Sequence, residues 1–189
     1  MPASGGGLPR NLEGLAARIR RCTWCRLHRG RLHAVPGEGP SRAQIVLVGE
    51  APGAEEDRQG LPFRGAAGKV LDEALARAGI PRSRVFVTNA VKCRPPGNRK
   101  PKGEEVAACR PYLLAQLGAI RPRVIVALGQ TAVRDLLGPV PLARVRGRWR
   151  SFGGVPVLAT YHPAAVLYNR RLLAKLATDL RKAKGRRRR

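Results

Sequence analysis

Short runs of apolar residues, rich in β-branched side chains, occur at four places along the chain. The first of them, Ile45 to Val48, is a run of four apolar residues that Gly49 closes. Runs of this length between turn residues are typical of buried strands. We therefore predict four strands, over residues 45–48, 85–88, 124–127 and 155–160.

Between these runs, apolar residues recur at the three- and four-residue spacing of a helix face. In the clearest case they extend from Val70 to Ala78, and a glycine and a proline then end the helix. Another pattern starts near Glu104 and contains Pro111, which we expect to bend the helix or to divide it in two. The predicted helices cover residues 12–19, 70–78, 104 onwards, 130–137 and 170 onwards.

Strands that alternate with helices predict an α/β protein, here a three-layer αβα sandwich with a central, mainly parallel four-stranded sheet. A chain of 189 residues is long enough for one domain with a full core. We place this single domain at residues 10–184. A flexible Gly/Pro-rich tail, residues 1–9, precedes it, and a basic tail, residues 185–189, follows it.

Three of the predicted strands lead into a polar residue that lies in a turn: Glu50, Asn89 and His162. The carboxyl ends of parallel strands lie along one edge of a sheet, and open α/β sheets bind their ligands there. We therefore expect these three side chains to converge on one crevice.

The turn after the first strand is also unusually acidic. Four of the 12 acidic residues in the chain lie within eight positions there: Glu50, Glu55, Glu56 and Asp57. A solvated acidic loop is one interpretation of this pattern. A ligand-binding loop at the end of a buried strand is the other, and both are open at this point.

The charge of the whole chain indicates its class of partner. There are 37 Lys and Arg residues against 12 Asp and Glu, a net charge of +25. Nucleic acid is the leading polyanionic partner, while ribosomal-type binding and binding to a membrane surface stay open on charge alone. No run of about 18 apolar residues indicates a membrane span. The N-terminus lacks the apolar core of a signal peptide, so we expect a cytoplasmic protein.

The four cysteines are candidates for a shared metal centre. Cys22 and Cys25 form a Cys-x-x-Cys pair, while Cys93 and Cys109 lie far along the chain. Four thiolates suit tetrahedral zinc or an iron–sulfur cluster. Redox chemistry of the first pair, or four unconnected core cysteines, are the alternatives; structural disulfides are not expected inside a cell.

Several motifs together resemble family 4 of the uracil-DNA glycosylases, the iron–sulfur members of that superfamily. The resemblance implies removal of uracil, as the free base, from single- and double-stranded DNA. It also implies a four-stranded parallel sheet and a [4Fe–4S] cluster on Cys22, Cys25, Cys93 and Cys109. The motifs that carry the resemblance are GEAPGAEED at 49–57, LPF at 61–63, GAAG at 65–68, TNAVKCRPPGNRKP at 88–101 and YHP at 161–163.

The resemblance also assigns roles in base removal. Phe63 would stack on the extruded uracil, and Asn89 would donate to its O4 and accept from its N3–H. His162 would hydrogen-bond O2 as negative charge develops on the leaving base. Gly49, Glu50, Ala51 and Gly53 would complete the pocket.

Two positions depart from relatives in the superfamily. Some of them place a water-positioning Asp where this chain has Ala51, so we assign the catalytic role to Glu50 instead. Gly53 stands where those relatives have a Tyr that excludes thymine, so another group must exclude it here. A related cross-linking branch uses a His in an inserted loop, and residues 94–103 contain none.

The expected DNA contacts come from two segments. The cluster would hold the loop between its last two cysteines, whose basic side chains would face phosphates. A wedge that fills the vacated base position would follow His162. The residues assigned to these contacts are Arg94, Arg99, Lys100 and Lys102 in the loop, and Val166 or Leu167 as the wedge.

We expect a monomer that acts on the nucleoid of a prokaryotic cell, with a sliding clamp as a candidate partner. A non-enzymatic, metal-stabilised nucleic-acid-binding protein is the first alternative, and an electron-transfer iron–sulfur protein is the second. The first alternative gives no role to Asn89, Phe63 and His162 together, and the second would not need the arginine tail.

Overall fold

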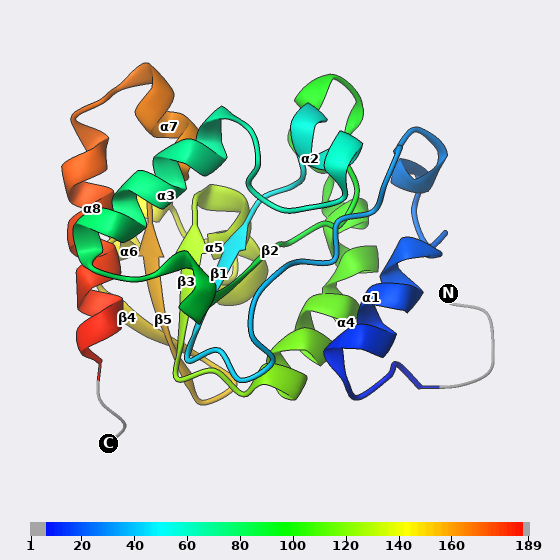
Figure 1. Ribbon diagram of the computed structural model, residues 1–189, viewed down its shortest axis with the longest axis horizontal. Helices are drawn as coiled ribbons and strands as arrows, with labels where there is room; N and C mark the ends of the chain where they lie inside the picture. Colours follow the sequence, from blue (N-terminus) through cyan, green and yellow to red (C-terminus); the bar gives the residue numbers. More distant parts are fainter. Residues whose placement is uncertain (1–6, 187–189) are drawn as a thin grey trace.

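A five-stranded sheet forms the centre of the molecule in the computed structural model, which describes residues 7–186 (Figure 1). Its strand order is β2-β1-β3-β5-β4. The first four strands in this order run parallel, and β4 is an antiparallel edge strand. The strands are β1 (Ile45–Gly49), β2 (Val85–Asn89), β3 (Val124–Leu128), β4 (Trp149–Phe152) and β5 (Val155–Thr160).

The four predicted strands are confirmed, and β4 is an addition to them. Its sequence, Trp-Arg-Ser-Phe, leaves two exposed residues between two half-buried ones, so it lacks the apolar run that marks the other strands. It pairs with β5 through a hairpin at Gly153 and Gly154. Both glycines have positive φ, as a tight two-residue hairpin turn requires.

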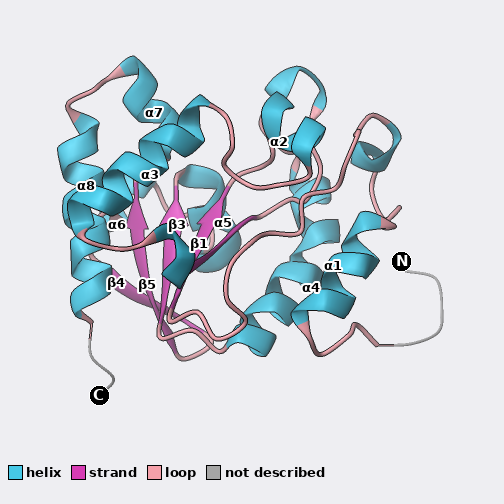
Figure 2. Cartoon of the chain, in the orientation of Figure 1, coloured by secondary structure: helices cyan, strands magenta, loops and turns pink. Residues whose placement is uncertain are grey.

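Helices cover both faces of the sheet, which confirms the three-layer prediction (Figure 2). Residues of α3, α7 and α8 pack on one face, and residues of α4, α5 and α6 pack on the other. Helix α1 packs against the outer side of α4 (Figure 1). The helices are α1 (Leu12–Arg20), α2 (Ala54–Gln59), α3 (Ala66–Ala78), α4 (Gly103–Ile120), α5 (Gln130–Leu137), α6 (Leu142–Val145), α7 (Pro163–Tyr168) and α8 (Leu172–Gly185). Three short 3-10 helices are η1 (Arg26–Arg29), η2 (Arg82–Arg84) and η3 (Pro96–Asn98).

Of the two outcomes expected for Pro111, division of the helix is wrong, because α4 is a single helix of 18 residues. A proline inside a helix costs about 3 kcal/mol. Tyr112, Leu113 and Leu117 follow it on the same helix and are buried. Each buried side chain of this size contributes about 1.5–3 kcal/mol, so packing outweighs the cost of the proline.

Most of the two predicted tails lies outside the described part of the chain. The structure does not describe residues 1–6 and 187–189. Within the described range, α8 ends at Gly185. No helix in this range is long and apolar enough to cross a lipid bilayer.

A buried carboxylate on α8 is hydrogen-bonded to the last residue of β5, which leads into the turn with His162, and it also pairs with Arg146 after α6. Asp179 is 1% exposed and accepts hydrogen bonds from Thr160 Oγ1 and Arg146 Nη1, both at 2.8 Å. Thr160 is fully buried as the last residue of β5. The carboxylate of Asp179 therefore fixes the end of the strand.

We expect Asp179→Asn to lower the free energy of unfolding by about 1–3 kcal/mol, because the new amide group faces a buried donor. Chemical denaturation measures this change. Glu73→Gln is the matched control, since Glu73 pairs with Arg77 and Arg170 at the surface, and its loss should be clearly smaller. Equal losses in the two variants would contradict the role given to Asp179.

Candidate functional site

A cavity of about 520 Å³ opens at the carboxyl edge of the parallel strands. Glu50 follows β1, Asn89 ends β2, and His162 lies two residues after β5; all three line this cavity. The structure therefore brings together the three polar residues that the sequence places after strands. Phe63, Ala51 and Gly53 line the same cavity.

Gly49 makes room for two of these side chains. It pairs with Asn89 in the β1–β2 register. A Cβ atom on Gly49 would lie 2.4 Å from Asn89 Oδ1 and 2.6 Å from Phe63 Cζ. Real Cβ atoms do not approach other atoms so closely, so Asn89 and Phe63 hold these positions only because residue 49 is glycine.

Phe63 is buried and is held in an uncommon backbone conformation. Its φ is 53°, in the left-handed region that non-glycine residues seldom adopt. Its ring lies against the ring of His162, with 5.7 Å between the centroids. Backbone strain of this kind is concentrated at binding and active sites, where the surrounding structure imposes it.

The sharp entry into α3 fixes the backbone of Phe63. A Cβ atom on Gly68 would lie 2.0 Å from the Phe63 carbonyl oxygen. The GAAG motif therefore allows α3 to begin directly beside Phe63. The role of Gly68 is packing, and it leaves the aromatic ring free to form a wall of the cavity.

His162 is the N-cap of α7, and this capping decides which ring nitrogen faces the cavity. Its Nδ1 accepts a hydrogen bond from the Ala164 N–H at 3.2 Å. In a neutral ring the proton then lies on Nε2. Burial lowers the pKa of His162, and the nearby Glu50 and Glu56 carboxylates oppose this only in part. The ring is therefore a neutral donor at pH 7.

Two buried polar atoms at the cavity have no hydrogen-bond partner among the described residues. They are His162 Nε2 and Asn89 Oδ1. Buried polar atoms are nearly always paired, and exceptions mark sites where a ligand supplies the partner. The structure thus leaves one donor and one acceptor available at the same cavity.

The acidic turn after β1 is mainly structural. Glu56 is buried in α2 and accepts hydrogen bonds from the backbone N–H groups of Gly53, Arg64 and Gly65, at 2.7 to 3.0 Å. These bonds close the loop that carries Phe63. Asp57 is also buried and accepts from the backbone of Leu32 and His33.

Glu50 differs from these acids because it lies partly exposed in the cavity wall. Thr131 Oγ1, near the start of α5, donates a hydrogen bond to Glu50 Oε2. Glu55 pairs with Arg58 on the protein surface. The interpretation of the turn as a solvated acidic loop therefore holds for Glu55 alone.

Sequence reasoning missed Thr131 and the structural part played by Glu56. Thr131 lies 81 residues from Glu50, and a threonine in a short helix has no distinguishing pattern. Glu56 had a signal, since it stands three residues after Gly53, at the N3 position of a capping box.

The basic loop after β2 divides into free and paired side chains. Lys100 and Lys102 are exposed. Arg99 donates to both carboxylate oxygens of the buried Glu105, at 2.7 and 2.8 Å. Arg94 donates to Asn98 Oδ1 at 2.8 Å. Arg99 is therefore held by a carboxylate, and the lysines have the freest access to phosphate.

The two candidate wedge residues lie in different environments. Val166 is 1% exposed and belongs to the core beneath α3 and α8, which removes it from contact with DNA. Leu167 is 51% exposed, and Tyr168 beside it is 93% exposed. Val166 is thus corrected to a core residue. Tyr168, which also lines the cavity, was missed because its pattern fits an ordinary helix end.

The four cysteines surround a second, smaller cavity between α1 and α4. Cys22 follows α1, Cys25 precedes η1, Cys93 follows β2, and Cys109 lies in α4. None of them forms a disulfide. The structure therefore brings the distant pair, Cys93 and Cys109, beside the Cys-x-x-Cys pair.

The surroundings of these sulfur atoms suit an iron–sulfur cluster. Arg31 Nη1 donates to Cys93 Sγ at 3.1 Å, and the Lys92 N–H donates to Cys109 Sγ at 3.3 Å. Hydrogen bonds of this kind tune cluster sulfurs. Tyr112, which lines the cavity, has a buried hydroxyl without a partner among the described residues.

Bare thiols are unfavourable as thiolates in this cavity. Burial raises the pKa of Cys109 to about 12, and it also raises the pKa values of Cys93 and Cys25. A bound cationic centre would displace these protons. Within residues 7–186, no three His, Cys, Asp or Glu side chains converge closely enough to hold a single metal ion.

Comparison with known proteins assigns the chain to a family. The model of the "Uracil DNA glycosylase superfamily" matches residues 36–183. This range includes every residue that lines the cavity of about 520 Å³ at the carboxyl edge of the strands, which we call the base-side cavity. The chain belongs to the uracil DNA glycosylase superfamily. Among its relatives in that superfamily, the Type-4 uracil-DNA glycosylase of Pyrobaculum aerophilum is 48% identical over 179 residues, 90% of this chain and 91% of the relative.

Other type-4 members of the superfamily are similarly close. The Type-4 uracil-DNA glycosylase of Archaeoglobus fulgidus is 46% identical, over 91% of each chain. That of Thermotoga maritima is also 46% identical, over 92% of this chain and 93% of the relative. These matches extend beyond the superfamily model, which begins after Cys22 and Cys25.

The assigned tautomer of His162 can be tested in the free protein by 15N NMR. We expect Nε2 to carry the proton at pH 7 and the titration midpoint to lie below the ordinary value of about 6.5, because burial disfavours the charged ring. The stability that this ring contributes is complete above about pH 6.5 and is lost as the pH falls towards the lowered pKa. Absence of the signal in His162→Gln assigns it. A proton on Nδ1 at pH 7 would contradict the capping argument.

Proposed function

We propose that this protein removes uracil from DNA by hydrolysing the N-glycosidic bond, which releases the free base and leaves an abasic site. The observation that carries the proposal is the pair of unpartnered buried atoms, Asn89 Oδ1 and His162 Nε2, at one cavity beside an aromatic ring. Uracil presents both a donor and acceptors on its edge. The names of the type-4 relatives support the same activity.

Asn89 selects the base. Its free Oδ1 accepts from uracil N3–H, and its Nδ2 donates to uracil O4. Cytosine has an acceptor at N3 and an amino donor in place of O4, so both contacts would be repulsive. Asn89 is 1% exposed, and its Oδ1 lies close to Gly49, so the side chain is confined at the wall of the cavity. Phe63 holds the ring of the extruded base by stacking, and a base must be extruded before cleavage.

His162 stabilises the departing base. Cleavage leaves negative charge on the uracil, and the neutral Nε2–H donates to O2 as that charge develops. The Ala164 N–H bond to Nδ1 keeps the proton on the correct nitrogen. Because the donor needs no reorganisation and lies in a buried site, its effect is greater in the transition state than in the ground state.

Glu50 acts on the sugar side of the bond. We assign it the attacking water, and its negative charge also stabilises the cationic sugar in the transition state. Thr131 orients the carboxylate by donating to Oε2, which leaves Oε1 for the water. The methyl group of Ala51 cannot accept a hydrogen bond from the water.

DNA would be held around the cavity mouth by two kinds of contact. Lys100 and Lys102 supply charge to the phosphates without reading sequence. Leu167 and Tyr168, both exposed at the end of α7, are placed to enter the space that the extruded base leaves. Tyr168 lines the cavity as well, so it can contact the nucleotide on its way in.

We propose a [4Fe–4S] cluster on Cys22, Cys25, Cys93 and Cys109, with a structural role. A single zinc ion would draw four sulfurs to about 3.8 Å from one another, from Zn–S bonds of about 2.3 Å. A cubane cluster takes one thiolate on each of four irons, so its ligands stand further apart. Hydrolysis of a glycosidic bond needs no electron transfer.

Uracil-containing DNA tests the proposed activity directly. Incubation followed by alkali should cut the labelled strand at the uracil position, and a strand with thymine there should stay intact. The two alternatives, a non-enzymatic nucleic-acid-binding protein and an electron-transfer protein, both predict no cleavage. An uncut uracil strand would refute the proposal.

Asn89→Asp should reduce uracil removal at least tenfold. The ionised carboxylate places a lone pair against uracil O4, and a mispaired buried group costs about 1–3 kcal/mol or more, where about 1.4 kcal/mol is a factor of ten. Weak cytosine removal should appear in single strands and increase as the pH falls, because only a protonated Asp can donate to cytosine N3. Single-turnover rates measure both effects.

Asn11→Asp is the control for the charge change in that experiment. Asn11 caps α1, and Asp is an equally good N-cap. This variant should keep the parent rate on uracil. An Asn89→Asp variant as fast as the parent would show that Asn89 does not read the base.

The cluster predicts four iron atoms per chain and a broad visible absorbance in protein purified without oxygen. Cys109→Ser should lose iron and lower the melting temperature more than it lowers the rate of uracil removal below that temperature, because metal binding is coupled to folding. Metal analysis and thermal denaturation check this. Zinc as the sole bound metal would contradict the assignment.

A further inference from the structure

Three adjoining hollows lie at the amino edge of the parallel strands, away from the base-side cavity. Their volumes are about 1110, 710 and 550 Å³, each larger than that cavity. Arg123 lines all three of them, and Arg42, Arg121 and Arg186 each line two. No Asp or Glu lines any of them. The hollows thus form one continuous basic surface.

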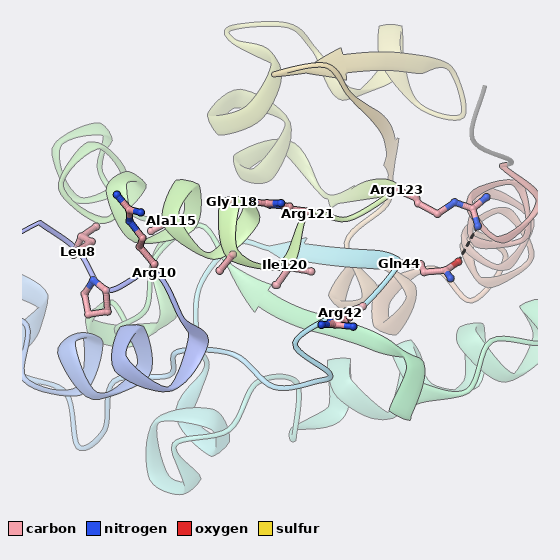
Figure 3. A pocket seen from close by; sticks show the side chains of 12 residues that line it. Leu8, Arg10, Arg42, Gln44, Ala115, Gly118, Ile120, Arg121 and Arg123 are labelled. Carbon is pink, nitrogen blue, oxygen red and sulfur yellow. Dashed lines mark hydrogen bonds between the residues drawn. The ribbon is translucent and has the colours of Figure 1, made fainter.

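We name this surface the amino-edge face and define it by five of the six arginines that line the first and third hollows, leaving out Arg186, whose guanidinium lies over the Trp149 ring. Figure 3 shows four of them around the first hollow: Arg10 before α1, Arg42 before β1, and Arg121 and Arg123 between α4 and β3. Gln44 accepts a hydrogen bond from Arg123 at 2.8 Å there. The five are Arg10, Arg42, Arg84, Arg121 and Arg123.

Four of the five arginines of this face have no side-chain partner within the described chain, while Arg123 donates to Gln44 Oε1 and to the Arg186 carbonyl oxygen. Arg10, Arg42, Arg84 and Arg121 are exposed. Within residues 7–186, their side chains make no hydrogen bond to protein, and none of the five arginines of the face is in an ion pair. Several arginines outside the face do pair with acids, as Arg99 does with Glu105. The face is therefore a concentration of uncompensated charge.

The backbone at Arg121 departs from the common pattern. It is the C-cap of α4 with φ at 52°, a position that glycine usually occupies. Glycine would remove this strain, and arginine keeps a positive charge at the negative end of the helix dipole. Arg121 is one of three non-glycine residues with positive φ in the described chain. Phe63, at the base-side cavity, is another.

The face and the base-side cavity lie at opposite ends of the same strands. Gln44 precedes β1, Arg84 precedes β2, and Arg123 precedes β3, while the cavity residues follow these strands or β5. Five residues at about 3.3 Å each separate the two edges by roughly 16 Å of sheet. Duplex DNA has a persistence length of about 50 nm, so a segment at the cavity does not fold back over the opposite edge.

We propose that the amino-edge face binds the phosphate backbone of a second DNA segment while the base-side cavity holds the first. The occupancy of the cavity rests on the proposed function, but the second contact does not require base removal. Phosphates are recognised by clustered guanidinium groups with few apolar anchors. Among the exposed large apolar side chains, Leu114 alone lines one of these hollows, whereas a protein partner would need an apolar core.

Two contacts would allow transfer between segments. An enzyme that holds one segment at each edge can release the first without leaving the DNA. This route suits a protein that searches mostly undamaged DNA for a rare base. The surface gives no sequence preference, because backbone contacts carry none.

A bridging experiment tests the second contact. Beads carry a duplex without uracil, a second fluorescent duplex without uracil is added, and the protein is titrated in at about 150 mM salt. The parent should retain fluorescence on the beads. Arg42→Gln/Arg84→Gln/Arg121→Gln should retain about tenfold less, and the salt slope of retention should flatten by about 2 to 3, at about 0.9 per lost contact.

The matched control removes the same charge from elsewhere. Arg134, Arg144 and Arg148 are exposed, line none of the three hollows and make no side-chain hydrogen bond within the described chain. Their triple change to Gln should retain fluorescence within about twofold of the parent, because it removes none of the proposed contacts. Equal losses in both triple variants would show that retention of fluorescence depends on net charge alone, which would overturn the proposal. No retention by the parent would also overturn it.

Uracil removal from a short duplex separates this inference from the proposed function. Both triple variants should cleave at the parent rate, which also shows that they fold. If the parent bridges but removes no uracil, the second contact stands and the proposed function fails. If the first triple variant does not fold, Arg10→Gln/Arg42→Gln takes its place and should also retain less fluorescence than the parent. Retention equal to that of the parent in this double variant would overturn the proposal.

Discussion

The base-side cavity depends on the absence of a side chain at Gly49. The parallel register between β1 and β2 sets Gly49 beside Asn89, so any Cβ atom there would meet the Asn89 amide and the Phe63 ring. The buried carboxylate of Glu56 closes the loop that carries Phe63, and Gly68 lets α3 start against it. One glycine at a strand end thus leaves the room in which Asn89 and Phe63, the residues proposed to select and to hold the base, lie close together.

The segment from Thr88 to Cys93 joins this cavity to the cysteine cavity. Lys92 is buried within it and donates to Thr88 Oγ1 and to the Asn89 carbonyl oxygen, both at 2.7 Å. Burial lowers the pKa of Lys92 to about 8, which leaves it mostly charged at neutral pH. Its own N–H donates to Cys109 Sγ. A centre on the cysteines would therefore hold the backbone of Asn89 in place over a distance of four residues.

The pattern of apolar residues predicted the features that depend on neighbouring residues in the sequence. The four parallel strands are apolar runs, and the polar residues that follow them in sequence must converge once the strands are parallel. The edge strand β4 was not predicted, because Arg150 and Ser151 are exposed and interrupt any apolar run. Only its pairing with β5 defines it as a strand. Arg99 and Val166 have the sequence features of DNA contacts, yet a buried carboxylate holds the first and the core covers the second. Such partners depend on tertiary structure, which periodicity does not record.

The placement of the acidic residues explains why so much positive charge remains at the surface. Glu56 and Asp57 are buried against backbone N–H groups, and Glu105, Asp135 and Asp179 each pair with one arginine. The arginines of the amino-edge face are thus left without an acidic partner within the described chain. An excess of +25 destabilises a compact chain through self-repulsion, and the core must offset this. In the proposed function two buried atoms at the cavity choose the base, whereas affinity for DNA comes from many phosphate contacts. Specificity and affinity can therefore reside on separate surfaces, and the opposite edges of one parallel sheet keep these surfaces apart.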